Sequence, residues 1–138
     1  MSTNLTIERM EEPAWDLIGG GINEYNTQQA GPENSHMICY VLKNEQGESL
    51  GGIIAIVHWE WLYINLMWIK DEFRGQGYGA QLMEVAEAEA IQHGARHAYL
   101  DTFTFQAPGF YEKLGYSVIG ELPDFPEGHS RFYMKKDL

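Results

Sequence analysis

Three glycines alternate with other residues at positions 75, 77 and 79, directly after Arg74. Glycine accepts positive φ angles and lets a bulky ligand approach the backbone closely. The segment lies between an apolar run and a helical pattern, so the free N–H groups of the helix's first turn point outward at the positive end of its dipole. Such a helix start binds anions, and Arg74 adds a fixed positive charge. The spacing therefore predicts a pyrophosphate site built mostly from main chain.

The glycine spacing excludes two common nucleotide-binding motifs. The dinucleotide fingerprint requires G-x-G-x-x-G, whereas this loop has G-x-G-x-G. The P-loop requires Lys followed by Ser or Thr after its last glycine, whereas Ala80 and Gln81 follow Gly79. The alternative to a phosphate site is a tight turn that needs glycine only for its shape.

Two motifs, taken in their order along the chain, resemble those of the GNAT superfamily of acyl-CoA N-acyltransferases. Arg74-x-x-Gly77-x-Gly79 is similar to the family's R/Q-x-x-G-x-G/A signature. Residues 107–116 resemble its A-x-x-x-Y-x-K-x-G-F segment, and residues 67–73 resemble its splayed strand and the approach to the loop. One predicted helix and one predicted strand separate the two motifs, as in the family. By element order, the resemblance covers nearly the whole chain.

The resemblance implies that acetyl-CoA is the co-substrate and that no metal is needed. Backbone N–H groups of the glycine loop would hold the pyrophosphate. The main chain just before the loop would pair with the pantetheine arm like an additional strand, with one N–H facing the thioester oxygen. Thr104 stands where the family often has asparagine, so it departs from the pattern. The expected cofactor-binding residues are Met67, Trp68, Ile69, Arg74, Gly75, Gln76, Gly77, Tyr78, Gly79, Ala80, Thr104 and Tyr111.

Tyr111 matches the family's tyrosine that often acts as general acid toward the departing thiolate. An amine attacks a thioester only when neutral, and a lysine-like amine has a pKa of about 10.4, so at pH 7 a proton must leave. The leaving thiol has a pKa near 8.5 and tyrosine has one near 10, so Tyr111 is the weaker acid. Its proton is therefore expected to help the thiolate leave without being essential. A core aromatic is its structural alternative. Glu60 and Asp101, followed by His58, are the candidate bases, and each has an ordinary structural role as its alternative.

Composition limits the partners. The net charge of −11 disfavours nucleic acid and anionic membranes and favours a cationic acceptor. We find no leader and no apolar run of about 18 residues, so we expect a cytoplasmic protein. His93 and His97 are interrupted by Gly94, so we predict no metal site. Cys39 lies alone in an apolar run, and we expect a buried thiol that forms no intramolecular disulfide.

The element pattern predicts one mixed α/β (α+β) domain over residues 1–138, with a mostly antiparallel sheet of six to seven strands and helices on both faces. We expect the last strand to expose an edge through which a homodimer could form. Strands are predicted at residues 3–10, 36–43, 50–59, 61–70, 96–103, 116–120 and 130–136, and helices at 13–29 with a break at 19–21, 80–93 and 107–114. An aromatic cluster is expected mainly in the core, with an acceptor pocket as the alternative: Trp59, Trp61, Tyr63, Trp68, Phe103 and Phe105.

Together with the resemblance, these patterns predict an N-acetyltransferase that moves an acetyl group from acetyl-CoA to a primary amine on a small molecule, by direct attack in a ternary complex. A non-catalytic acyl-CoA-binding or regulatory module is one alternative. A protein acetyltransferase acting on an N-terminus or a lysine is another. No residue pattern names the acceptor, so polyamines, aminoglycoside-like compounds, amino acids and xenobiotic amines stay open.

Overall fold

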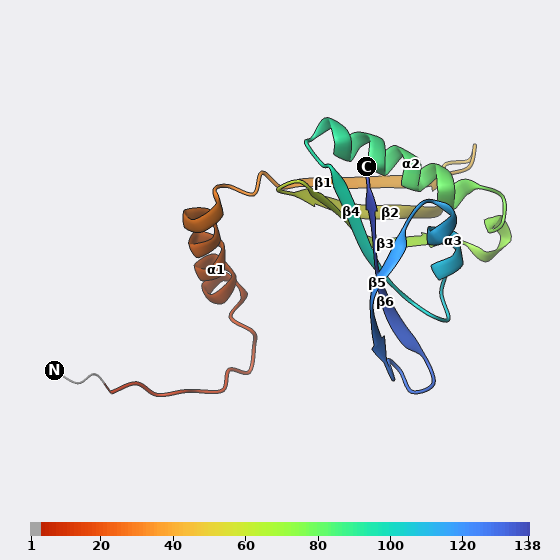
Figure 1. Ribbon diagram of the computed structural model, residues 1–138. Coiled ribbons are helices and arrows are strands. Elements are labelled where there is room, and N and C mark those ends of the chain that lie inside the picture. The colour runs from red at the N-terminus through yellow and green to blue at the C-terminus, as the bar shows by residue number, and fades with distance from the viewer. Residues whose placement is uncertain (1–3) are drawn as a thin grey trace. The chain divides into compact units, whose positions relative to one another are not determined.

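The computed structural model describes residues 4–138, and this part of the chain divides into two units, residues 4–33 and residues 34–138. The first unit holds an irregular segment followed by α1 (Trp15–Ala30). None of the described helices is long and apolar enough to cross a membrane. The second unit contains β1 (His36–Lys43), β2 (Ser49–His58), β3 (Trp61–Ile69), the short 3-10 helix η1 (Asp71–Phe73), α2 (Tyr78–Gln92), β4 (His97–Phe103), α3 (Pro108–Lys113), β5 (Ser117–Pro123) and β6 (Ser130–Asp137), as shown in Figure 1.

The N-terminal unit differs from prediction in two respects. Residues 4–10 form no strand, and Thr3, the first residue of the predicted strand, lies outside the described residues. Apolar alternation alone does not make a strand, because a strand needs a hydrogen-bonded neighbour. The helix α1 runs without interruption through residues 19–21, so the predicted break is wrong. Glycine lowers helix stability but leaves the backbone hydrogen bonds in place.

The second unit is built on one sheet of six strands in the order β1-β2-β3-β4-β6-β5. Every neighbouring pair is antiparallel except β3 and β4, which run parallel. The predicted mixed and mostly antiparallel sheet is therefore confirmed. The expectation that the last strand exposes an edge is wrong, because β6 lies between β4 and β5. The edge strands are β1 and β5.

A single core lies between the sheet and α2, which packs across β1, β2 and β3 (Figure 1). The predicted apolar stripe of α2 is buried there, and α3 adds Tyr111 to the same core. Both helices of this unit thus contribute to one core, where we expected helices on both faces. Strand alternation explains why the expected buried thiol is wrong. Ile38 faces the core, so its neighbour Cys39 faces away and is exposed.

Two carboxylates on α2 connect this helix to strands far apart in the sequence. Glu89 accepts hydrogen bonds from the Tyr40 hydroxyl and contacts the ring of His36 at 2.8 Å, which joins α2 to β1. Glu87 accepts a hydrogen bond from the Lys136 ammonium group at 2.8 Å and one from Tyr116 at 2.9 Å. These contacts tie α2 to the edge strand β1 on one side and to β6 and Tyr116 on the other.

Candidate functional site

The strands β3 and β4 separate partway along their length. Their ladder runs only from the pair Trp61 and His97 to the pair Tyr63 and Tyr99. Beyond that point β3 stays paired with β2, and β4 stays paired with β6. The two edges that face each other across the opening therefore carry unpaired backbone N–H and C=O groups. An extended ligand can pair with such an edge as an added strand does.

The glycine loop presents free N–H groups a few residues after β3 ends. Gly75 and Gly77 have φ angles of +73° and +88°, and an added Cβ at either would meet nothing within 4 Å. The helix α2 starts at Tyr78 with no capping side chain and no acidic residue in its first turn. In the described part of the chain, no acceptor contacts the N–H groups of residues 76–80. Together with the helix dipole, these groups form a site that could bind an anion.

The other two residues of the motif shape the surroundings of this anion site. Arg74 donates from Nε to the Ile69 carbonyl at 2.7 Å, and its Nη1 lies 2.6 Å from an oxygen of Asp71. The guanidinium thus braces the bend between β3 and the loop, and it shares its charge with a carboxylate. An added Cβ on Gly79 would lie 3.0 Å from the ring of Phe110. Gly79 therefore allows α3 to pack closely against the start of α2.

Tyr111 is buried on α3, next to this packing contact. Its ring meets those of Phe110 and Tyr116 edge-on, at centroid distances of 5.1 and 6.1 Å. Burial raises the pKa of Tyr111 above its ordinary value, and the negative charge of Asp101 raises it further. The hydroxyl group therefore keeps its proton at neutral pH, as a general acid must. This position also fits the core aromatic that the sequence left as the alternative.

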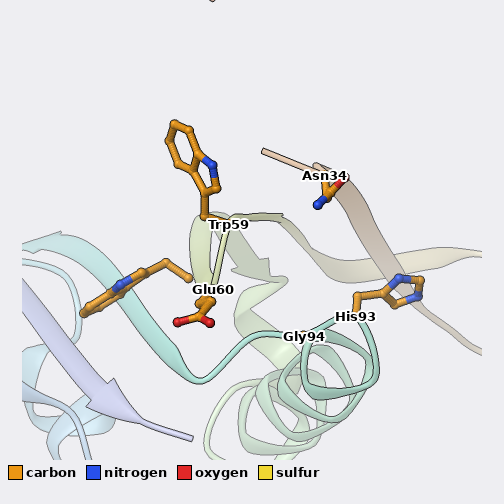
Figure 2. A pocket seen from close by; sticks show the side chains of 6 residues that line it. Asn34, Trp59, Glu60, His93 and Gly94 are labelled. Atoms are coloured by element: carbon orange, nitrogen blue, oxygen red, sulfur yellow. The ribbon is translucent and has the colours of Figure 1, made fainter. Parts of the chain in front are cut away.

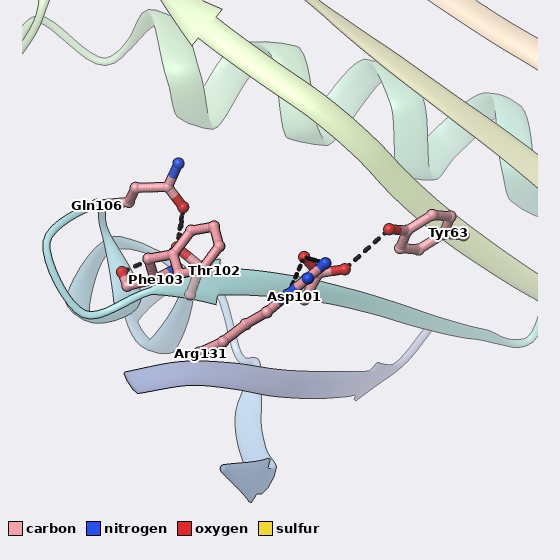
Figure 3. A network of polar contacts seen from close by, with 6 residues as sticks. All are labelled: Tyr63, Asp101, Thr102, Phe103, Gln106 and Arg131. Atoms are coloured by element: carbon pink, nitrogen blue, oxygen red, sulfur yellow. Dashed lines mark hydrogen bonds and ion pairs between the residues drawn. The ribbon is translucent and has the colours of Figure 1, made fainter. Parts of the chain in front are cut away.

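Asp101 lies at the centre of a polar network where β3 and β4 cease to pair (Figure 3). One of its oxygens accepts hydrogen bonds from Nε and Nη2 of Arg131, at 3.0 and 2.5 Å. The other accepts one from the Tyr63 hydroxyl at 2.8 Å. Burial raises the pKa of Tyr63 to about 12, and the hydrogen bond to Asp101 contributes. The network joins β3, β4 and β6 beside the opening between the strands.

Glu60 lies in the turn between β2 and β3, at the closed end of the paired strands. It faces a hollow of about 510 Å³ (Figure 2). It also forms a long ion pair with Arg96, at 3.8 Å. From the start of β3 to Met67 the strand rises by about 20 Å, so Glu60 is not brought together with the opening between the strands. The hollow is lined by Asn34, Trp59, Glu60, Trp61, His93 and Gly94.

Two other polar residues singled out in the sequence make contacts within the fold. The Thr104 hydroxyl accepts the N–H of Ser130 at 3.1 Å and lies 3.4 Å from Nδ1 of His129, so it ties the end of β4 to β6. The His58 Nε2 lies 3.5 Å from the Tyr99 hydroxyl, near the closed end of the strand pair. Neither residue faces the free N–H groups of the loop.

The aromatic cluster does not form part of the core. Trp59, Trp68 and Phe105 are exposed, and the other three members are half-buried. The expectation that these rings lie mainly in the core is therefore wrong. In β3 the cause is alternation, since Trp61 and Tyr63 alternate with the buried Leu62 and Ile64 and so face away from α2.

The structure also brings together groups that the sequence kept apart. His36 on β1 lies beside Glu89 of α2 and His93, the residue that follows α2, and one potential ligand atom from each lies within 4.8 Å of the others. The rings of His36 and His93 stack at a centroid distance of 3.5 Å. Sequence spacing missed this cluster because His36 comes from a distant strand. Arg131 was missed for the same reason, since it meets Asp101 only through the neighbouring position of β6 and β4.

Comparison with known proteins identifies the family of this chain. The sequence profile of the acetyltransferase (GNAT) family matches residues 6–116. The chain belongs to the GNAT acetyltransferase family. The resemblance seen in the two motifs is thereby confirmed, and this GNAT protein is an enzyme of the acetyltransferase class. A blasticidin-S acetyltransferase from Streptomyces morookaense is 39% identical to it over 95 residues, which cover 68% of this chain and 70% of that protein.

Solved structures extend the similarity to the fold. The 1.9 Å crystal structure of an acetyltransferase from Bacillus cereus ATCC 14579 matches this GNAT chain with a TM-score of 0.89 and 33% identity, over 97% of this chain and 98% of that one. An aminoglycoside 6'-N-acetyltransferase complexed with coenzyme A matches with a TM-score of 0.64 and 20% identity, over 89% of this chain and 86% of that one. The second match shows a shared fold.

Proposed function

We propose that this GNAT acetyltransferase transfers the acetyl group of acetyl-CoA to a primary amine on a small molecule, by direct attack in a ternary complex. The observation that carries the proposal is the continuity between the parted strands β3 and β4 and the free N–H groups of residues 76–80. An extended arm fits the first feature, and an anion fits the second. The shared fold with an enzyme complexed with coenzyme A supports the choice of cofactor.

The residues present fit acetyl-CoA. The N–H groups of Gln76, Gly77, Gly79 and Ala80 would hold the pyrophosphate, and the empty space beside Gly75 and Gly77 leaves room for it. The free edge of β3 at residues 67–69 would hold the pantetheine arm, and one N–H there would stabilise the negative charge that develops on the thioester oxygen. When bound, acetyl-CoA supplies an activated acetyl group. Arg74 would brace the loop through its contacts with Ile69 and Asp71, in addition to any contact with phosphate.

The acceptor would approach from the side of Asp101. The Asp101 carboxylate accepts hydrogen bonds from Arg131 and Tyr63, which hold it in place. Because it is negatively charged, it would also hold the ammonium form of the amine and pass the proton on to water. The neutral amine then forms the new C–N bond as the C–S bond breaks, and the nitrogen releases its second proton to solvent as it becomes an amide. Tyr111 would give its proton to the sulfur, and solvent would return a proton to Tyr111. We assign no role to Glu60, because it lies at the closed end of the strands.

Acetyl transfer to a panel of amines tests the proposal. The panel contains blasticidin S, an aminoglycoside, spermidine and a lysine peptide, and both thiol release and product mass are followed. Acetylation of at least one small amine is expected, faster than that of the peptide. The relative that is a blasticidin-S acetyltransferase is the reason for including that compound.

Three outcomes would contradict the proposal. No binding of CoA at millimolar concentration would exclude the cofactor. Tight CoA binding with no transfer to any amine would indicate a binding module. Faster acetylation of the peptide would indicate a protein acetyltransferase.

A further inference from the structure

Two histidines and a glutamate meet where the end of α2 lies beside the start of β1. Nε2 of His36 lies 2.8 Å from Oε2 of Glu89, and the rings of His36 and His93 stack at a centroid distance of 3.5 Å and an interplanar angle of 9°. One potential ligand atom from each of the three residues lies within 4.8 Å of the other two. All three residues belong to the unit of residues 34–138, so their contacts are independent of the placement of the N-terminal unit.

The local structure explains why these three side chains converge. Ile38 of β1 is buried in the core beneath α2, so His36 and Tyr40, two residues to either side, face α2 as well. Glu89 and His93 are four residues apart, which places two side chains on one face of a helix. The helical geometry extends to His93, because its N–H group still donates to the Glu89 carbonyl at 3.2 Å. The strand and the helix thus direct these side chains at the same point.

The donor set is typical of a transition-metal site. Two imidazole nitrogens and one carboxylate oxygen are a known set of three protein ligands for zinc, with a fourth position left for water. Mg²⁺ and Ca²⁺ take oxygen ligands instead. Bond lengths of about 2.0–2.1 Å at tetrahedral angles separate neighbouring ligand atoms by ~3.3 Å. The atoms here lie within 4.8 Å of one another, so rotation of the side chains can bring them to that spacing.

Tyr40 supports the carboxylate of this cluster. Its hydroxyl group donates to Oε1 of Glu89 at 2.5 Å, whereas His36 contacts the other oxygen, Oε2. Carboxylates that bind metal ions are commonly held by such a hydrogen bond, which fixes their orientation. The two hydrogen bonds involve only His36 and Tyr40, and neither requires the second imidazole of His93 beside them.

We propose that His36, Glu89 and His93 bind one divalent transition-metal ion of the zinc type. The ion takes the place of the proton between Nε2 of His36 and Oε2 of Glu89, and that proton passes to solvent. The ring of His93 turns out of the stack, so that one of its nitrogens completes the set of three ligands. The sequence predicts no metal site because Gly94 interrupts the helix between His93 and His97, whereas the fold brings His93 to His36.

The metal ion has a structural role in this proposal. A helix rises by about 1.5 Å per residue, which places Glu89 about 16 Å along α2 from Tyr78 and the free N–H groups of the loop. The ion therefore joins the end of α2 to the edge strand β1 and takes no part in acetyl transfer. A metal ion that binds only the folded state raises the stability of that state.

Zinc titration of the tag-free, metal-free protein tests the proposal. Calorimetry should show one Zn²⁺ per chain with a Kd in the micromolar range or below, and excess zinc should raise Tm by several degrees. Cobalt(II), used as a spectroscopic probe, should give the intense visible absorption of tetrahedral coordination. His93→Phe keeps a ring for the stack and removes the ligand nitrogen. It should raise the Kd for zinc by about 100-fold or more, while Tm of the metal-free protein stays close to the wild-type value.

Two further variants separate metal binding from packing. Tyr40→Phe keeps the ring and removes the hydrogen bond to Glu89, so the Kd for zinc should rise about tenfold. His97→Phe is the matched control, because His97 also contacts a carboxylate, that of Asp137 at 2.8 Å, but belongs to no cluster of three such groups among the described residues. Its Kd for zinc should equal that of the wild type.

Three results would overturn the proposal. The first is the absence of saturable zinc binding. The second is an unchanged Kd for zinc in His93→Phe, or an equal rise in His97→Phe, since either would place the ion elsewhere. The third is half an ion per chain, which would indicate a bridge between two copies. None of these measurements involves acetyl transfer, so their failure would leave the proposed function untouched.

Discussion

The two halves of the proposed site are built in different ways. The cofactor half is a stretch of main chain, residues 76–80, whose N–H groups are left free by the glycine loop at positive φ and by the start of α2. The acceptor half is a set of side chains from three strands, in which Asp101 joins Tyr63 and Arg131. Main-chain groups are the same in any sequence, whereas side chains can be exchanged one at a time. The cofactor half should therefore hold one ligand, and the acceptor half should set which amine reacts.

The largest effect is expected from Asp101→Asn. Loss of the carboxylate removes the group that holds the ammonium form and relays its proton, so kcat/KM for the amine should fall about 100-fold. The Kd for CoA should stay within about twofold, since the cofactor half is untouched. Steady-state kinetics and calorimetric CoA titration measure the two quantities. Glu60→Gln is the control, with little change in either, and an equal loss of CoA affinity in Asp101→Asn would remove the distinction between the halves.

Gly77→Ala should act on the other half. An alanine strains the φ angle of +88° and places a methyl group in the space beside the free N–H groups. We expect the Kd for CoA to rise about 30-fold, as follows from the loss of a hydrogen bond to a charged group. Gly47→Ala is a matched control because Gly47 has a φ angle of +81° in the turn between β1 and β2, also with nothing within 4 Å. If both variants raise the Kd for CoA equally, general backbone strain explains the effect, and the position of Gly77 in the loop does not.

Tyr111→Phe should have a smaller effect on turnover. The thiol is a good leaving group, so we expect kcat to fall about tenfold while KM for the amine is kept. Burial raises the pKa of Tyr111 above its ordinary value, so the hydroxyl stays protonated as the pH rises from 7 to 9. The ratio of wild-type to variant kcat should therefore be constant over this range. Tyr116→Phe is the control, because its buried ring lies in the same core. A ratio that falls between pH 7 and 9 would show that Tyr111 loses its proton earlier.

The smallest effect is expected outside both halves, at Glu89. Its hydrogen bonds from Tyr40 and then from His36 lower its pKa below the ordinary value of 4.5. A carboxyl group with a lowered pKa in the fold contributes stability that is present above the unfolded value and lost as the pH falls through the folded one. Glu89→Gln should lower Tm by a few degrees at pH 7 and by less at pH 3, as thermal unfolding measures. Activity at pH 7 should hold, and a pH-independent loss of Tm would refute this account of Glu89.

Local features of the fold could be read from the sequence. The hairpin of β1 and β2, the helix α2 and the glycine loop each depend on residues within one short segment, and all were predicted close to their observed bounds. The position of Asp101 against Arg131 could not be predicted, because it depends on β6 lying beside β4 in the sheet. The same holds for Cys39, whose exposure depends on which face α2 covers. Long-range placement requires the sheet order, which periodicity does not contain.

The prediction for the N-terminal residues was wrong for a related reason. The strand expected at residues 3–10 has the right alternation, but a strand also needs a neighbour, and the described chain provides none for residues 4–10.

The most direct test of the account is a titration of the ¹⁵N-labelled protein with CoA, followed by amide resonances. The amides of residues 76–80 should shift and saturate together, with the Kd measured by calorimetry, while the amide of Gly47 stays in place. Saturable CoA binding that leaves the resonances of residues 76–80 unchanged would contradict the claim that these N–H groups hold the pyrophosphate.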